Sequence, residues 1–528
     1  MGERERIPVT VPIQPHLADH RFEGRAVFPA VEALQLMAGL VSQRHPHVPV
    51  CTSSDARFLR FLPVPVEAAT FEAIVELEPV DGGVTARLLT QARMGAGGMA
   101  RLLEHAVVTF GPLPEPPLIP PSFLAAPLGP GLAVRSADLY GAMVPFGPAY
   151  HNARDPIVLA PGGATGRVVC PKLPFPPGPL GSPFPFDAAF HLGCGWGERY
   201  VGAVLFPVGY ESRHILVPTE PGGEYLGRVV PRDGSLHAPA GAAPEHLKAR
   251  PSSADRSPAH ARFDFWIFDS GGRLCEVCFG VRMEDVSRGR FVPPAWGRWD
   301  GRDPLEPLCP DVAGIALVEL AAVLPPLARR SLTPVEQELA AGLGDRRRPS
   351  FIAARVALKQ LARQTSRTAE GDDRLHTVAQ DSIRPVCPAA EGRMATPFCS
   401  VAHDRRFAVA VAAHVPIGVD LEPIADKAVR GMRLFLSEEE RRLVREDPRG
   451  VDYAATCLWT IKEAAAKALN IRLPHAWHAV EAVELLAGRT RVRVNGHELT
   501  ALHAEVDGHL LTTLCVGGGE GEEKERGR

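Results

Sequence analysis

Runs of proline set the strongest limit on how this chain can fold, because they interrupt every long regular element. The chain has 528 residues and 52 prolines. Two runs are dense: PLPEPPLIPPSFLAAPLGP (112–130) and FVPPAWGRWDGRDPLEPLCPD (291–311). Proline lacks the amide proton that a sheet ladder needs and blocks the interior of a helix. Neither run can extend the strand-like segment before it, so each predicts a joint between separately packed segments.

A chain of this length also exceeds one ordinary hydrophobic core. Strand-like runs, such as the hairpin FDFWIFDSGGRLCEVCFGVRM, precede the second joint, and helical patterns alternate with short strands after it. The predicted class is α+β, with two β-rich units that each carry one long helix, followed by a mixed α and β domain. The predicted segments are a first β-rich unit (1–111), a linker (112–130), a second β-rich unit (131–288), a linker (289–311), the mixed domain (312–516) and a tail (517–528).

Three further segments belong to this outline. The apolar stretch Val312–Leu327 contains Glu319 and meets Pro325 too early for a membrane span, so it predicts a buried helix. The polar run from Pro218 to His260 predicts a long surface insertion. The glycine-rich, charged tail predicts disorder, because it has nothing apolar to bury.

Composition excludes several classes of protein. With 45% hydrophobic residues, 23% charged residues and a net charge of -3, the chain is typical of a soluble globular protein, and neither nucleic acid nor a membrane is an expected partner. The N-terminus lacks the apolar core of a signal peptide, so we expect a cytoplasmic location. The ten cysteines are scattered. The close pair Cys275 and Cys278 has no second pair to complete a zinc site, so we expect reduced thiols.

The segment PIGVDLEP carries two acids on one face of a predicted strand. Ile417, Val419 and Leu421 alternate with Gly418, Asp420 and Glu422, so a strand here buries the aliphatic side chains and directs both carboxylates to its other face. Two carboxylates at that separation repel each other unless a cation neutralises them. A hard cation such as Mg²⁺ fits best, because this run offers oxygen ligands and no histidine or cysteine.

The later segment LWTIKEAAAKAL is a strong helix former that can complete this site. Trp459, Glu463 and Lys467 fall one turn apart on one face, and Lys462 lies beside that face. Glu463 would add a third carboxylate, and the lysines would supply positive charge for phosphate oxygens. Taken alone, a Glu and a Lys four apart are usually a solvated helix pair.

These two segments resemble the Sfp-type 4'-phosphopantetheinyl transferases, whose hallmarks are G-x-D-x-E on a strand and W-x-x-K-E-x-x-x-K on a later helix. Between them, FLSEEERRLV is similar to the family's F-S-x-x-E element but is one residue longer after the phenylalanine. Upstream, FCSVAHDRRFAVAVAA and RRRPSFIAARVALKQLA resemble the family's Ser-x-x-His strand and its basic helix. The resemblance covers roughly residues 330–515 and implies a two-subdomain, pseudo-symmetric α/β fold.

The resemblance also implies site roles and a reaction. Asp420, Glu422 and Glu463 would hold Mg²⁺, whereas coenzyme A, the second substrate beside an acyl carrier protein, would meet cationic side chains: Arg355, Lys359, His403 and Lys462. A serine of the apo carrier protein would attack the β-phosphate of coenzyme A, and adenosine 3',5'-bisphosphate would leave. Glu463, or a water held by the metal, would take the serine proton, and Lys467 would stabilise the leaving phosphate. A structural histidine remains an alternative role for His403.

The N-terminal half contains a second constellation. His20 precedes a predicted helix whose apolar stripe includes Val31, Leu34 and Met37. In PFPFDAAFHLGCGWG, Asp187 stands at the start of another predicted helix, and His191 shares its face. Taken alone, a helix N-cap and two structural histidines would explain these residues.

The spacings H-x-x-x-G-x-x-x-x-P (from His20) and D-x-x-x-H (from Asp187) resemble dehydratase domains of polyketide synthases, which have a double hotdog fold. FGPAY is similar to their Y-G-P-x-F element with the aromatic residues exchanged. The resemblance implies that His20 removes the proton α to a thioester and that Asp187 protonates the departing β-hydroxyl. An apolar cavity would raise the pKa of Asp187 so that it can begin protonated, and His191 would orient it. The substrate would be an acylated carrier protein within a polyketide or polyunsaturated fatty acid synthase system.

Three alternatives remain open at this stage. The first half also resembles a product-template cyclase, which has the same double hotdog fold and a similar histidine and aspartate pair but directs aldol cyclisation. It is also consistent with a catalytically silent module that recruits carrier proteins. For the second half, the alternative is a degenerate domain kept for structure, although the intact acids and lysines argue against it.

Overall fold

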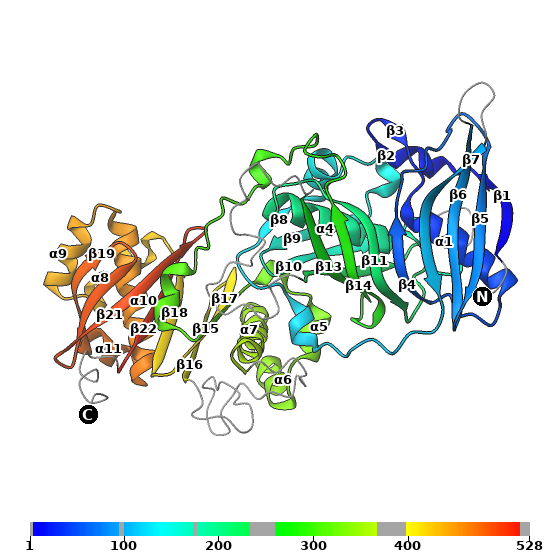
Figure 1. Ribbon diagram of the computed structural model, residues 1–528. Helices are drawn as coiled ribbons and strands as arrows, with labels where there is room; N and C mark the ends of the chain where they lie inside the picture. Colours follow the sequence, from blue (N-terminus) through cyan, green and yellow to red (C-terminus); the bar gives the residue numbers. More distant parts are fainter. Residues whose placement is uncertain (1–3, 94–99, 173–176, 233–258, 367–397, 518–528) are drawn as a thin grey trace, which may run out of the picture. The chain divides into compact units, whose positions relative to one another are not determined.

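The computed structural model describes residues 4–93, 100–172, 177–232, 259–366 and 398–517. The chain forms two compact units (Figure 1). The N-terminal unit comprises Met1–Leu118, Gly131–Ser235 and His246–Gly301. The C-terminal unit comprises Ile119–Pro130, Leu236–Glu245 and Arg302–Arg528.

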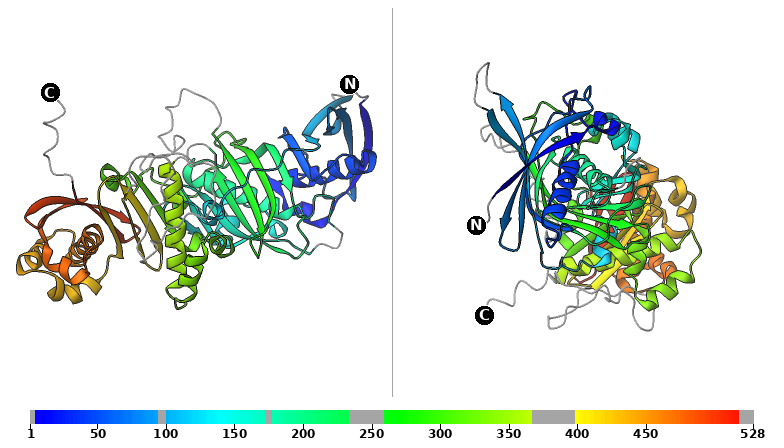
Figure 2. Two further views of the ribbon diagram at one scale, coloured as in Figure 1. Left: turned by 90° about the horizontal axis from the view of Figure 1, so that it is seen from below. Right: turned by 90° about the vertical axis from the view of Figure 1, so that its right-hand side faces the viewer.

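The N-terminal unit is built on one antiparallel sheet of 12 strands with two long helices. In the first half of the sheet, the strands lie around α1 (Ala30–Arg44), which runs along them in Figures 1 and 2. Their spatial order is β1 (Glu5–Pro12), β5 (Thr70–Val80), β6 (Gly83–Arg93), β7 (Ala100–Phe110) and β4 (Thr52–Phe58).

The second half of the sheet repeats this arrangement around α4 (Phe184–Tyr200). Its order is β11 (Phe206–Ile215), β14 (Leu274–Glu284), β13 (His260–Asp269), β12 (Glu224–Pro231), β10 (Gly163–Val169), β9 (Ala153–Ala160) and β8 (Leu132–Val134). The halves join where β4 pairs with β11, with Ser54 opposite Ser212. Two helix-wrapping sheets joined edge to edge are a double hotdog, so the predicted fold of this half is confirmed.

The helix positions follow from the apolar pattern. The predicted stripe on α1 is buried, with Leu34, Met37 and Val41 fully shielded from solvent. In α4 every residue except Arg199 is buried, because strands β9 to β13 all pack against the helix. Its polar residues, including Asp187 and His191, are therefore placed inside the unit.

The C-terminal unit has two antiparallel sheets, each with one long helix. In the first, β15 (Gly314–Glu319), β17 (Phe407–Ala413) and β16 (Phe398–His403) pack against α7 (Arg348–Ser366). In the second, α10 (Val451–Leu469), orange in Figure 2, packs on a sheet whose last strands are red. The order is β18 (Ile417–Pro423), β22 (His509–Cys515), β21 (His497–Val506), β20 (Arg489–Val494) and β19 (Val480–Leu486). The predicted two-subdomain fold is confirmed.

One prediction from an apolar run is wrong, and one from a polar run is wrong over part of its length. Val312–Leu327 is not a helix, because it contains strand β15, whose residues are all buried, and α5 (Pro325–Arg330) begins only at the proline. A short apolar run fits a buried strand as well as a buried helix. The proposed insertion from Pro218 to His260 contains β12 in its first part, and its residues 233–258 lie outside the described part of the chain, as does nearly all of the tail.

The proline-rich segment between the two hotdogs belongs to the C-terminal unit. Its short helix α2 (Pro121–Ala125) is held by Gln360 of α7, whose amide donates to the carbonyls of Ser122 at 3.0 Å and Ala126 at 2.8 Å. The amide of Gly129 donates to Leu317 O of β15 at 2.8 Å. Residues 119–130 therefore pack as part of the C-terminal unit. The helix and strand that hold them, α7 and β15, come after residue 301 in the sequence.

Nine of the ten cysteines lie in the described part of the chain. Each described cysteine is a free thiol, and Cys170, Cys194, Cys275, Cys278 and Cys457 are buried. Among the described residues, no helix combines the length and apolar character that crossing a membrane requires.

Candidate active sites

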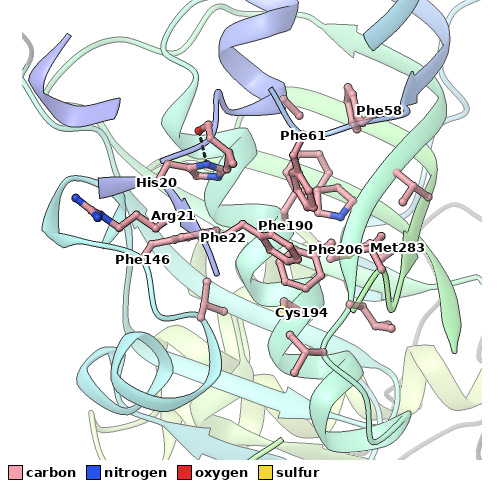
Figure 3. A pocket seen from close by; sticks show the side chains of 18 of the residues that line it. His20, Arg21, Phe22, Phe58, Phe61, Phe146, Phe190, Cys194, Phe206 and Met283 are labelled. Carbon is pink, nitrogen blue, oxygen red and sulfur yellow. Dashed lines mark hydrogen bonds between the residues drawn. The ribbon is translucent and has the colours of Figure 1, made fainter. Parts of the chain in front are cut away.

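The first candidate site is a cavity inside the N-terminal unit that collects residues from both hotdogs (Figure 3). Its volume is about 710 Å³, within the usual range for small-molecule sites. His20, from the segment just before α1, and Asp187 and His191, from the first turns of α4, all line it. The structure therefore brings together three of the residues that the sequence singled out, although His20 and Asp187 lie far apart along the chain.

His20 is held in one orientation. Its Nδ1 donates to the carbonyl of Val27 at 3.0 Å, so in the neutral ring Nε2 carries no proton and can accept one. The ring stacks on Phe146 with centroids 4.4 Å apart, and Tyr150 lies 5.0 Å away. Burial lowers the pKa of His20, an effect that the nearby carboxylate of Asp187 opposes. The resting imidazole is neutral and suited to act as a base.

Asp187 is buried beside His191, with its Oδ2 3.1 Å from His191 Nε2. On the other side of that ring, Nδ1 lies 3.2 Å from the hydroxyl of Tyr140. The same hydroxyl accepts a hydrogen bond from the amide of Ala153 at 2.7 Å, so its own proton is available for His191. Asp187 Oδ2 and His191 Nε2 lie at ion-pair distance, but neither atom has a hydrogen-bond partner in the described structure. Tyr140 was missed from the sequence, because nothing in its local pattern distinguishes it from a core tyrosine.

The remaining cavity wall is apolar. Figure 3 shows aromatic side chains from several elements around the space, including Phe22, Phe58, Phe61, Phe190 and Phe206. The charged lining residues Arg21, Glu23 and Arg60 are exposed at the rim. Water inside such a wall finds few partners, so the three polar residues face a poorly solvated space.

The second candidate site lies where α10 packs on β18 in the C-terminal unit. Gly418 makes this contact possible, because a Cβ at that position would lie 1.8 Å from the carbonyl oxygen of Ala464 in α10. The helix backbone therefore rests directly on the strand. This close approach places Glu463 of α10 beside Asp420 and Glu422 of β18, and carboxylate oxygens of the three side chains lie within 4.8 Å of one another.

The three carboxylates have the properties of a cation site. Asp420 is buried, and its Oδ2 has no hydrogen-bond partner in the described structure. Burial, together with the neighbouring charges of Asp420 and Glu422, raises the pKa of Glu463 to about 7. An all-oxygen donor set whose members repel one another and include an unsatisfied buried oxygen fits a hard divalent cation such as Mg²⁺.

Cationic groups border these acids. Lys467 Nζ donates to Asp420 Oδ1 at 2.9 Å and to the carbonyl of Val419 at 2.7 Å. Partial burial, followed by the charges of Lys467 and Arg355, lowers the pKa of His403, which keeps an exposed edge at the end of β16. Lys467 thus lies beside the carboxylates, and His403 is close enough to Lys467 and to Arg355 for both charges to act on it.

Two predicted phosphate-binding lysines have other partners. Lys359 is completely buried, and its Nζ forms an ion pair with Glu336 at 3.0 Å. Lys462 Nζ is also buried, lies 2.9 Å from Glu440 Oε1 and donates to the carbonyls of Trp477 and Val480. The prediction that these side chains contact coenzyme A is wrong for this structure, because a buried charge requires neutralising and hydrogen-bonding partners and each lysine is already committed to them.

Comparisons with known proteins were made by family model, by sequence and by structure. Residues 416–515 match the family model described as the 4'-phosphopantetheinyl transferase superfamily. No curated protein sequence matches the chain significantly.

Among solved structures, the dehydratase domain of the CurJ module of curacin polyketide synthase is 14% identical, with 54% of this chain and 93% of that domain covered and a TM-score of 0.40. The dehydratase domain of RzxB from Pseudomonas fluorescens is 18% identical, with 52% and 93% covered and a TM-score of 0.37. The match of residues 416–515 contains Asp420, Glu422 and Glu463, so the C-terminal carboxylate site lies within the segment that matches the 4'-phosphopantetheinyl transferase superfamily model.

Proposed function

We propose that the C-terminal unit transfers 4'-phosphopantetheine from coenzyme A to a serine of an acyl carrier protein in a Mg²⁺-dependent reaction. The observation that carries this proposal is the cluster of Asp420, Glu422 and Glu463, whose oxygens lie within 4.8 Å of one another inside the segment that matches the superfamily. A degenerate domain would have no reason to keep three mutually repelling acids in one place.

The arrangement assigns a role to each side chain. Asp420, Glu422 and Glu463 would hold Mg²⁺, which supplies positive charge for the diphosphate of coenzyme A. Lys467 and Arg355 add fixed positive charge where the phosphate oxygens bind, and His403 contributes a hydrogen-bond donor. The carrier serine Oγ attacks the β-phosphorus, Glu463 accepts the serine proton, and the bond to the departing adenosine 3',5'-bisphosphate breaks.

A mass measurement tests the transferase. The purified protein is incubated with coenzyme A, Mg²⁺ and several apo carrier proteins, and we expect one carrier to gain the mass of a phosphopantetheine arm. The gain should disappear in EDTA and in Glu463→Gln, but persist in Glu439→Gln, which alters an exposed acid on α9 (Glu438–Glu446). Transfer that survives in Glu463→Gln would refute the assigned site.

The N-terminal unit supplies the second part of the proposal, the dehydration of 3-hydroxyacyl carrier-protein thioesters to 2-enoyl thioesters. The observation that carries it is the placement of His20 and Asp187, one from each hotdog, on a single, largely apolar cavity. A silent docking module would need neither a buried acid nor a histidine whose ring is fixed with Nε2 free.

The proposed reaction needs one base and one acid. Neutral His20 accepts the C2 proton at Nε2, and the electron pair forms the C2–C3 double bond as the C3–O bond breaks. Asp187, acting as a carboxylic acid, gives its proton to the departing hydroxyl, so water leaves. His191, fixed by Tyr140, keeps the carboxyl of Asp187 directed into the cavity. Proton return from His20 to Asp187 restores the starting state.

Absorbance or mass change on 3-hydroxyacyl pantetheine thioesters tests this activity. We expect dehydration by the wild type and a loss of about a thousandfold in His20→Ala, since general base catalysis contributes about 10²–10⁴. His47→Ala removes an exposed histidine and should leave the rate unchanged. Equal rates in the two variants would show that His20 is structural.

A further inference from the structure

The side chains of the cavity wall indicate which acyl chains can bind, provided that the N-terminal unit is the proposed dehydratase. We propose that this unit accepts 3-hydroxyacyl chains whose carbons beyond C3 are hydrocarbon, and that Cys194 limits how deep the chain can extend. The inference rests on the polar groups of the wall and on the path of α4 along it.

Beyond His20, Asp187 and His191, the buried polar side chains that line the described cavity are His105 and Cys194. His105 is occupied at both nitrogens: Nε2 lies 2.8 Å from Thr90 Oγ1, and Nδ1 donates to the carbonyl of Arg60 at 3.3 Å. The thiol of Cys194 donates to Glu198 Oε1 at 3.6 Å. These hydrogen bonds already use the polar atoms of both side chains.

Away from the charged residues of the rim, an additional oxygen on the acyl chain would therefore lose its water without gaining a side-chain partner. Placing an unpaired ketone or hydroxyl in apolar surroundings is unfavourable, whereas a hydrocarbon chain gains by leaving water. The aromatic side chains in Figure 3 offer only this second kind of contact. The wall thus disfavours the oxygen-rich chains that a cyclase of poly-β-ketones would need to bind.

The helix α4 sets the scale of the cavity. Asp187, Phe190, His191 and Cys194 line it, which is the spacing of one helix face. At a rise of 1.5 Å per residue, Cys194 lies about 10 Å along the axis from Asp187. Cys194 is the last residue of α4 that lines the cavity, and the lining residues Met143, Val204 and Leu205 are buried. A chain that follows α4 from the acid therefore meets this helix for the last time at Cys194.

Binding and turnover together test the proposal. Titration calorimetry on Asp187→Asn, in which turnover is slow, compares 3-hydroxydodecanoyl pantetheine with a chain of equal length that carries two further ketones. We expect the hydrocarbon chain to bind at least about tenfold more tightly. Equal affinities would overturn the assigned substrate class. If the wild type binds with this selectivity but dehydrates neither chain, the proposed dehydratase fails while the chain preference stands.

The depth limit is tested by Cys194→Phe. We expect the affinity for the dodecanoyl chain to fall at least about tenfold, because the larger ring fills its far end, while 3-hydroxybutanoyl pantetheine changes less than about twofold. Equal losses for both chains would overturn the role of Cys194. Cys194→Leu repeats the test with a smaller side chain if circular dichroism shows that the phenylalanine variant is misfolded, and Cys194→Ala should leave both chains bound.

Discussion

The two candidate sites manage buried charge in opposite ways. The carboxylate site gathers three acids and Lys467 around one point, with His403 near both Lys467 and Arg355. The cavity isolates one carboxyl and two imidazoles within an apolar wall. The first arrangement suits a reaction whose reactants carry phosphate charge, whereas the second suits the controlled movement of one proton away from water. The two sites should therefore lose activity through different kinds of amino-acid substitution.

The largest expected effect is a double dissociation of the activities. Asp420→Asn removes a carboxylate from the cation site and should lower phosphopantetheine transfer by about a thousandfold, while Asp187→Asn should lower dehydration by a similar factor. Each variant should retain the other activity, because the two residues belong to different compact units. Both rates are measured on one preparation of each variant, and a parallel loss of both would break the comparison.

The next effect separates the charge that performs chemistry from the charge that holds the scaffold. Lys462→Met leaves Glu440 buried without its ion partner, and breaking a buried pair costs about 3–5 kcal/mol. We expect a large fall in the unfolding free energy of the C-terminal unit, measured by denaturant titration. Lys427→Met, at an exposed lysine on α8 (Asp426–Phe435), should change it little. Matching stabilities would mean that Lys462 is free to serve the site.

These differences also show what the sequence could predict. Asp420, Glu422 and Glu463 were identified because strand and helix periodicities place them on defined faces, and Gly418 fixes the contact between those faces. The buried ion pairs of Lys359 and Lys462 could not be foreseen, because their acids, Glu336 and Glu440, come from other helices. Side-chain partners of this kind depend on tertiary packing.

The same limit applies to the N-terminal unit and its borders. The spacings around His20 and Asp187 indicated two hotdogs, and the sheet confirms them. The contact of Tyr140 with His191 arises from a segment with no distinctive pattern. Residues 119–130 looked like a linker because proline prevents regular pairing, yet Gln360 and Leu317 hold them through backbone groups that sequence composition does not reveal.

Tyr140→Phe sharpens the comparison on the cavity side, where orientation matters more than charge. The variant loses the hydroxyl that fixes His191, so we expect kcat for dehydration to fall about tenfold with little change in KM, because this positioning residue does not touch substrate. Tyr210→Phe is a matched control, since its hydroxyl bonds Ser53 at 2.8 Å in the core and not at the cavity. Similar kinetics for both variants would assign Tyr140 to stability alone.

The smallest expected effect concerns the pH dependence of dehydration. Burial penalises the charged form of His20 and so lowers its pKa below 6.5. The neutral base therefore persists to lower pH than for an exposed histidine, and the acidic limb of kcat/KM should have its midpoint below 6.5. Phe146 covers the ring at a centroid distance of 4.4 Å, so Phe146→Ala should admit water, raise the pKa of His20 and move this midpoint upward. Phe61→Ala opens the rim without touching His20 and should leave the midpoint in place. An upward shift in both variants would mean that the whole cavity, rather than the stacked ring, keeps His20 neutral.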